Sequence, residues 1–247
     1  MSGGRRGSDE AERAQANVVG VAILLGVTML SLGVLTASIG TVVESNAAAA
    51  DADRVAADLD AALDPVATTG PGRGRVSFTD GRLRTVERTV RVVNDSGVVA
   101  TEEVGGLVFT SDRQRVAFVG GAVVRGTGST ARMYTEPPIA ASRGVLLVGV
   151  GRLNASGPDA VGGSGPTSVV LRTNVTHDRR ALGDGTYRVA VETETPGAWE
   201  SHFERQNATT ERRTFDGDGV ESVVAEFPGN RTTYFVEHDL RTEVRRG

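Results

Sequence analysis

The chain contains no cysteine, and all 27 of its basic residues are arginine, so lysine is absent as well. Without cysteine, disulfide frameworks, thiolate zinc sites and cysteine nucleophiles are excluded; without lysine, so are Schiff-base and P-loop lysine mechanisms. Only three histidines are present (His177, His202 and His238), which argues against a histidine-rich metal centre. The net charge is −4, which leaves no basic surplus to neutralise phosphates, so we expect no nucleic-acid partner.

What is present is enough apolar material for a folded core, 39% of 247 residues, and therefore one or two domains. Arginine-only basicity with a small acid excess is typical of a GC-rich genome and suggests a halophile.

The N-terminal part is dominated by 30 consecutive uncharged residues, 14–43. As a helix, residues 18–43 would extend roughly 39 Å, against about 30 Å for the hydrocarbon core of a bilayer, whereas the apolar region of a secretory signal has only about 7–15 residues. The pattern predicts a transmembrane helix. Arginine lies only on its leading side, which predicts a cytoplasmic N-terminus, a head outside the cell and localisation at the cell membrane.

The helical pattern continues beyond Glu44 through an alanine-rich stretch in which Val55, Leu59 and Leu63 follow one another at i+4 spacing. Asp64-Pro65 then ends it. We therefore expect one helix of about 50 residues. Its second half should form an amphipathic stem outside any globular core, with its aspartates at the wetter positions: Asp51, Asp53, Asp58 and Asp60.

Three glycines recur every seven residues in the apolar helix: Gly26, Gly33 and Gly40. They fall near one stripe and would allow a neighbouring helix to approach closely. The alternative interpretation is that glycine is simply common in membrane helices.

A short motif precedes the apolar helix: Arg13-Ala14-Gln15-Ala16-Asn17-Val18-Val19-Gly20. It resembles the class III signal of archaeal, and specifically haloarchaeal, type IV pilins. The resemblance implies that a prepilin peptidase cuts between Ala14 and Gln15, which makes Gly20 the sixth mature residue. The second and third mature positions, often Ser-Pro in haloarchaeal pilins, are here Ala16 and Asn17.

This resemblance implies a surface subunit held at the membrane as a precursor and assembled with other pilin subunits through its N-terminal helix, into a pilus or pseudopilus used for adhesion. The glycines of the helix, Gly20, Gly26, Gly33 and Gly40, would serve helix packing. The alternative is an uncleaved membrane-anchored protein whose extracellular β domain binds a partner. A third and less favoured hypothesis is an extracellular enzyme.

Past Pro65 the composition changes to Val, Thr, Arg and Gly with frequent turn signals, which is typical of β structure. We expect an α+β fold in which the long helix precedes an antiparallel β-rich head. Its segments are a cleavable leader (1–14), the transmembrane and stem helix (15–64), a linker (65–74) and the extracellular head (75–247). Within the head we expect a hairpin at Asp80-Gly81, a turn at 94–97, a surface loop at 162–166 and a short helix at 197–204.

Candidate chemistry is sparse. Asp216, Asp218 and Glu221 could wrap calcium but read more simply as a hairpin turn, since no full EF-hand loop is present. His177-Asp178 would point to opposite faces of a strand, and no nucleophile motif accompanies the pair. We therefore expect no enzyme activity, no metal and no cofactor. Five N-x-S/T sequons, all in the head, predict glycosylation sites: Asn94, Asn154, Asn174, Asn207 and Asn230.

Overall fold

A computed structural model of the chain describes residues 6–64, 66, 69–112, 114–215 and 219–247. Within the first helix the side chains are described for residues 21–36 and from 42 onward. The contacts divide the chain into two compact units, Met1–Ala47 and Ala48–Gly247. The boundary lies inside the first helix, not after it.

The expected fold class is wrong in two respects. The fold is mainly β: in the part of the chain that the structure describes, strands far outnumber helices, which are α1 (Arg6–Leu63), α2 (Pro196–Arg205) and the short 3-10 helix η1 (Gly128–Thr130). Among the residues whose placement is described, no helix offers an apolar stretch long enough to cross a membrane.

The end of α1 agrees with its local signal. The helix stops at Leu63, next to Asp64-Pro65, because a residue that precedes proline is disfavoured in the α conformation. The helix α2 likewise covers the predicted segment 197–204, with Pro196 in its first turn.

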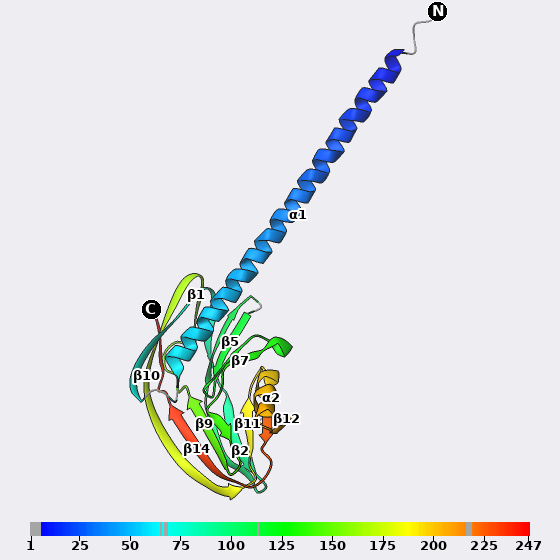
Figure 1. Cartoon of the computed structure of the whole chain (residues 1–247). Coiled ribbons are helices and arrows are strands. Elements are labelled where there is room, and N and C mark those ends of the chain that lie inside the picture. Colours follow the sequence, from blue (N-terminus) through cyan, green and yellow to red (C-terminus); the bar gives the residue numbers. More distant parts are fainter. Residues whose placement is uncertain (1–5, 65, 67–68, 113, 216–218) are drawn as a thin grey trace, which may run out of the picture. The chain divides into compact units, whose positions relative to one another are not determined.

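The strands of the second unit form two sheets (Figure 1). The larger sheet has the order β7-β6-β5-β4-β1-β10-β14-β9-β8, with β15 pairing to β10. Its strands are β1 (Gly70–Val86), β4 (Gly106–Ser111), β5 (Gln114–Val119), β6 (Ala122–Arg125), β7 (Arg132–Thr135), β8 (Ile139–Ala141), β9 (Val145–Arg152), β10 (Ala160–Gly185), β14 (Arg231–Asp239) and β15 (Glu243–Arg246).

The smaller sheet has the order β12-β13-β11-β2-β3. Its strands are β2 (Thr89–Asn94), β3 (Gly97–Glu103), β11 (Arg188–Glu192), β12 (Thr209–Arg213) and β13 (Ser222–Glu226). Pairing in the two sheets is antiparallel except between β9 and β14, which are parallel.

The larger sheet is the middle layer of the second unit, covered on both faces. Along β4, Leu107 and Phe109 belong to the cluster that includes α1, while Val108 belongs to the cluster shared with the smaller sheet and α2. Successive side chains of a strand point to opposite faces. Because both faces are buried, β4 and β5 are almost continuously apolar instead of alternating apolar and polar residues.

The second half of α1 contributes to this core. Five of its apolar side chains are at most 1% exposed and pack with β1, β4 and β5: Ala52, Val55, Ala56, Leu59 and Leu63. The prediction that this part of the helix lies outside any globular core is therefore wrong. The i+4 stripe that suggested an amphipathic stem is the face that the sheet buries.

Three further local predictions can be compared with the strands. The turn at 94–97 is confirmed, since β2 ends at Asn94 and β3 begins at Gly97. The hairpin at Asp80-Gly81 is wrong: β1 runs through it as one strand, with a bulge between Phe78 and Asp80. Residues 70–74 of the expected linker lie in β1, and the expected loop 162–166 lies in β10.

Candidate functional site

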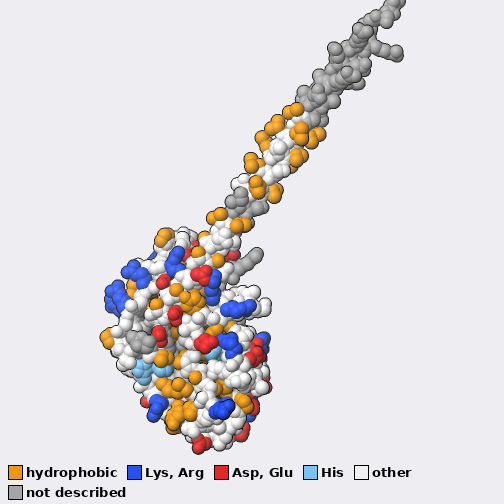
Figure 2. Space-filling view, viewed as in Figure 1, with side chains coloured by type: hydrophobic (Ala, Val, Ile, Leu, Met, Phe, Trp, Pro, Cys, Tyr) orange, Lys and Arg blue, Asp and Glu red, His pale blue; other side chains and the backbone are white. Residues whose placement is uncertain are grey.

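The first unit exposes apolar side chains along the helix (Figure 2). Exposed fractions run from 52% at Leu25 to 72% at Leu30. The side chains are Val21, Ile23, Leu24, Leu25, Val27, Met29, Leu30, Leu32, Val34, Leu35, Val42 and Val43. Since consecutive helical residues are about 100° apart, Ile23, Leu24 and Leu25 already cover most of the circumference. A helix that is apolar all round is normally covered by other apolar groups.

Both threonine side chains of residues 21–36 make hydrogen bonds within the helix itself. The hydroxyl of Thr28 donates to the carbonyl of Leu25 at 2.9 Å, and that of Thr36 to the carbonyl of Leu32 at 2.8 Å. These groups can therefore enter an apolar environment without leaving a donor unpaired.

Two of the four glycines assigned to helix packing have described surroundings. A Cβ placed on Gly26 or Gly33 would meet nothing within 4 Å, so both positions are open to a neighbour. Gly20 and Gly40 lie in stretches of α1 whose side chains are not described.

The residues of the predicted cleavage site, Arg13, Ala14 and Gln15, have a helical backbone within α1. Their side chains lie outside the described part of the chain, and so do residues 1–5 of the predicted leader. Cleavage therefore stays a prediction.

Carboxylates of α1 fix the part of this helix that belongs to the second unit to the edge of β1. The strand β4 pairs with β1 only from Arg82 to Val86, so the earlier part of β1 has β10 on one side and no described strand on the other. Asp51 accepts the backbone N–H of Thr79 at 2.7 Å, and Asp58 accepts that of Ser77 at 3.0 Å. The helix thus satisfies a strand edge that would otherwise be open.

From the sequence, the four aspartates of this part of the helix are expected to be exposed to solvent. That expectation is wrong for Asp51, which is 4% exposed. Asp60 accepts the Thr135 hydroxyl at 2.6 Å, which ties the helix to β7. Asp53 is the exposed member of the group and forms an ion pair with Arg125.

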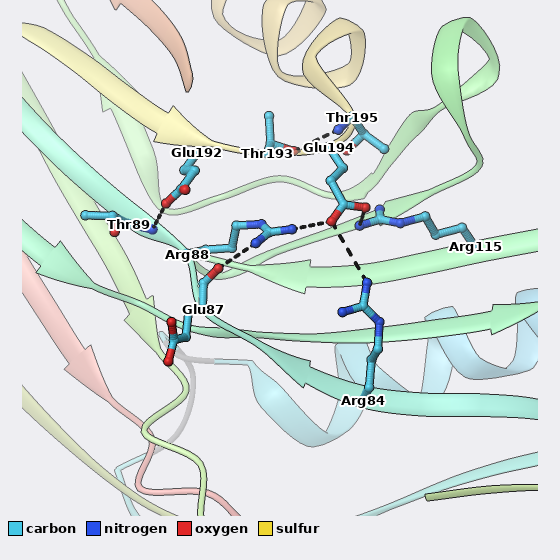
Figure 3. A network of polar contacts seen from close by, with 9 residues as sticks. All are labelled: Arg84, Glu87, Arg88, Thr89, Arg115, Glu192, Thr193, Glu194 and Thr195. Atoms are coloured by element: carbon cyan, nitrogen blue, oxygen red, sulfur yellow. Dashed lines mark hydrogen bonds and ion pairs between the residues drawn. The ribbon is translucent and has the colours of Figure 1, made fainter. Parts of the chain in front are cut away.

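A cluster of arginines surrounds one carboxylate between the sheets (Figure 3). Glu194, in the connection from β11 to α2, pairs with Arg88 and accepts from Arg115 at 3.2 Å, and Arg84 lies at 4.0 Å. The two closer arginines are each 8% exposed. Burial lowers the pKa of Arg115, and the charge of Glu194 opposes that shift.

This cluster connects the larger sheet, through Arg84 on β1 and Arg115 on β5, to the segment that leads into α2. A further contact in Figure 3, from the Thr89 N–H to Glu192 at 2.8 Å, joins β2 to the end of β11. An open groove of about 1050 Å³ runs beside it, lined in part by Arg84, Arg88 and Glu194. Because one carboxylate, that of Glu194, links arginines from β1, from β5 and from the segment between β1 and β2, the cluster holds the two sheets together.

The histidines do not form the pair considered from the sequence. His177 contacts His238 and Thr69, not its neighbour Asp178. His202 is buried in α2, 2% exposed, and hydrogen-bonds with Gln206 at 2.8 Å. Burial lowers the pKa of His202, with Glu136 opposing the shift, so its imidazole is neutral near pH 7.

Aromatic residues mostly fill the core. Trp199 is 1% exposed and packs with Phe203 at 5.8 Å between ring centroids. The Tyr187 hydroxyl donates to the Leu182 carbonyl at 2.6 Å, and Tyr134 is 48% exposed.

The sequons lie at the surface of the head. Asn154, Asn174, Asn207 and Asn230 are exposed and Asn94 is half-buried. The amide of Asn154 already donates to Asp239 at 3.1 Å, and the side chain of Asn94 accepts the N–H of Ser96 within its turn. Glycosylation stays a prediction for all five.

The calcium interpretation of residues 216–221 falls partly outside the described residues, which omit Asp216 and Asp218. In the described part of the chain, no group of three or more His, Asp or Glu side chains is placed to hold a metal ion.

Comparison with known proteins adds a family but no activity. No curated protein and no solved structure matches the chain. The model of one family, described as a family of unknown function (DUF7289), matches residues 13–243. That match begins at the arginine before the predicted cleavage site and extends to the start of β15. The chain therefore belongs to the DUF7289 family.

Proposed function

We propose that this chain is a type IV pilin-like surface subunit that assembles with copies of itself through its N-terminal helix. The observation that carries the proposal is the apolar surface of residues 21–36 and 42–43, exposed on all sides of the helix. Burying the exposed part of roughly ten such side chains would contribute on the order of 10 kcal/mol per subunit. Copies of the same helix supply a matching apolar surface, and the β head supplies the surface for adhesion.

Three features support self-assembly. The hydroxyls of Thr28 and Thr36 are satisfied within the helix, Gly26 and Gly33 leave room for close approach, and no aspartate, glutamate or arginine interrupts residues 14–43. Removal of a charged leader followed by retention of an apolar helix is the processing that such a subunit requires. The residues proposed for cleavage are Arg13 and Ala14, with Gln15 as the mature N-terminus.

Processing is tested by mass spectrometry of the protein isolated from the cell surface. A chain that begins at Gln15 is expected. Replacing Arg13 and Ala14 by glutamate should block the cut, while Arg6→Glu, the same arginine-to-glutamate change at a position farther from the cut, should leave it intact. A surface protein that retains Met1 would contradict the proposal and favour the uncleaved membrane-anchored binding protein.

Assembly is tested by sedimentation and electron microscopy of the processed protein. Leu24→Glu together with Leu30→Glu should abolish sedimentable filaments, because each buries a carboxylate in an apolar interface. Val98→Glu is the matched control: Val98 is 52% exposed on β3, so a glutamate there should leave assembly unchanged. Filaments that persist in the double variant would show that the helix does not hold them together.

A further inference from the structure

Two imidazole rings face each other on neighbouring strands of the head. His177 on β10 and His238 on β14 are direct cross-strand partners, and their Nδ1 atoms are 2.8 Å apart. The ring centroids are separated by 5.0 Å and the rings are nearly perpendicular, at 79°. Of the pair, His177 is exposed and His238 is 8% exposed, so one ring is open to solvent while the other is fixed by its surroundings.

The hydrogen bonds of His177 define a consistent tautomer. Its Nε2 lies 2.9 Å from the Thr69 hydroxyl. If Nε2 carries the proton and donates it to that hydroxyl, Nδ1 is left with a lone pair directed at His238. Metal-binding histidines are commonly oriented in this way, by a second ring nitrogen that donates to an oxygen.

The protonation state of His238 also suits metal binding. Burial, reinforced by the nearby His177, lowers the pKa of His238 to about 4, while Asp64 opposes the shift. Near pH 7 the ring is therefore neutral. Because a metal competes with protons for the ring nitrogen, such a histidine binds metal without first losing a charge.

We propose that the facing Nδ1 atoms of His177 and His238 bind a late first-row divalent transition metal, with Cu²⁺ preferred. The present separation of 2.8 Å is that of a hydrogen bond between the two nitrogens, so the exposed ring of His177 has to turn slightly before both lone pairs can meet at one metal ion.

The proton balance of binding is simple. With the tautomer of His177 described above, His238 donates its Nδ1 proton to the lone pair of His177 in the metal-free pair. When the metal binds both Nδ1 atoms, His238 takes the other neutral tautomer, with its proton on Nε2, and no net proton is released. Water would fill the remaining positions of the metal. Imidazole nitrogen suits copper and nickel, and affinity in this series is greatest for Cu²⁺.

The composition of the chain makes this site easy to test. The chain has no cysteine and one other histidine, His202, which is buried in α2 and bonded to Gln206. We would titrate copper(II) sulfate into the full-length protein at pH 7.5 by isothermal titration calorimetry. One equivalent should bind, and His177→Gln and His238→Gln should each weaken this binding at least tenfold. The matched control His202→Gln should leave it unchanged.

The N-terminal amine can bind copper as well, so the double variant His177→Gln/His238→Gln measures that background. Wild-type affinity no greater than that of the double variant would overturn the proposal. Should a variant fail to fold, the electron paramagnetic resonance spectrum of the wild-type copper complex decides instead. Coupling to two imidazole nitrogens supports the site, and coupling to one or none refutes it. The inference concerns the head alone and does not depend on cleavage or assembly.

Discussion

Removing the carboxylate of Asp51 tests how the helix is fixed to the head. The two oxygens of Asp51 accept the N–H of Thr79 at 2.7 Å, the N–H of Asp80 at 3.2 Å and the hydroxyl of Thr79 at 3.3 Å. Arg54, one turn along the helix, donates to the same carboxylate at 2.9 Å. The substitution Asp51→Ala therefore leaves two strand-edge amides of β1 without their acceptor.

The magnitude follows from the kind of bond and the exposure of its donors. A hydrogen bond to a charged group contributes about 1.5–3 kcal/mol, so the loss of two would cost about 3–6 kcal/mol if both donors were sealed from water. Thr79 and Asp80 are exposed residues, and water replaces part of that loss. We expect the free energy of unfolding to fall by about 2–3 kcal/mol. For a chain of this size, the corresponding fall in melting temperature is about 5–10 °C.

Trp199 provides the assay, because it is the one tryptophan of the chain and is 1% exposed in the core between the sheets. Its fluorescence should follow unfolding of the head in a thermal scan of the full chain. Asp53→Asn is the control: the Asp53 side chain is 59% exposed, and loss of its ion pair should cost under about 1 kcal/mol. Equal stability of the two variants would refute the view that the carboxylate of Asp51 holds the helix to β1.

Three other perturbations have definite outcomes. Glu194→Gln should lower the free energy of unfolding by about 2–3 kcal/mol, since the substitution leaves the buried guanidinium of Arg115 without a counter-charge. Urea unfolding would measure this loss, and an unchanged urea midpoint would contradict the prediction. The pKa of His238 is about 4 in the folded chain and about 6.5 when unfolded, so proton uptake by the unfolded state should reduce stability as the pH falls from about 6.5 to 4. His238→Gln should flatten that pH dependence in a series of melting curves, and an identical slope would rule out the histidine as its source. Gly74→Ala should destabilise the head, because the added Cβ would lie 2.1 Å from the Cβ of Ala62 on the helix. The melting temperature measures this loss, at about 2–4 °C per kcal/mol. A value within about 1 °C of wild type would show that the strand can shift to make room.

Local signals predicted local structure correctly. The end of α1 before Asp64-Pro65, the turn at 94–97 and the helix α2 each depend on residues within a few positions of one another. Asp80-Gly81 shows the limit of such signals. It has the composition of a hairpin turn, yet pairing with β10 from Gly70 to Arg84 outweighs the local preference. Asp80 and Gly81 pair with Ser164 and Gly163, directly after the bulge between Phe78 and Asp80.

The contacts of the candidate sites could not be predicted in the same way. His177 and His238 are 61 residues apart, and Arg88 and Glu194 are 106 residues apart. Their proximity depends on the order of strands, which the sequence did not reveal. The neighbouring pair that the sequence offered, His177-Asp178, is separated by the alternation of a strand.

By itself the sequence determined the chemical inventory of this protein: no thiol, no lysine, an uncharged apolar helix near the start and a β-rich remainder. It also determined where α1 stops, since that depends on backbone preference alone. Only the tertiary structure decided that one helix has two environments, with residues 21–36 exposed and Val55, Leu59 and Leu63 buried on a sheet. The physical reason is that apolar periodicity specifies which face of a helix is buried, whereas the surface that buries it is assembled from strands distant in the chain.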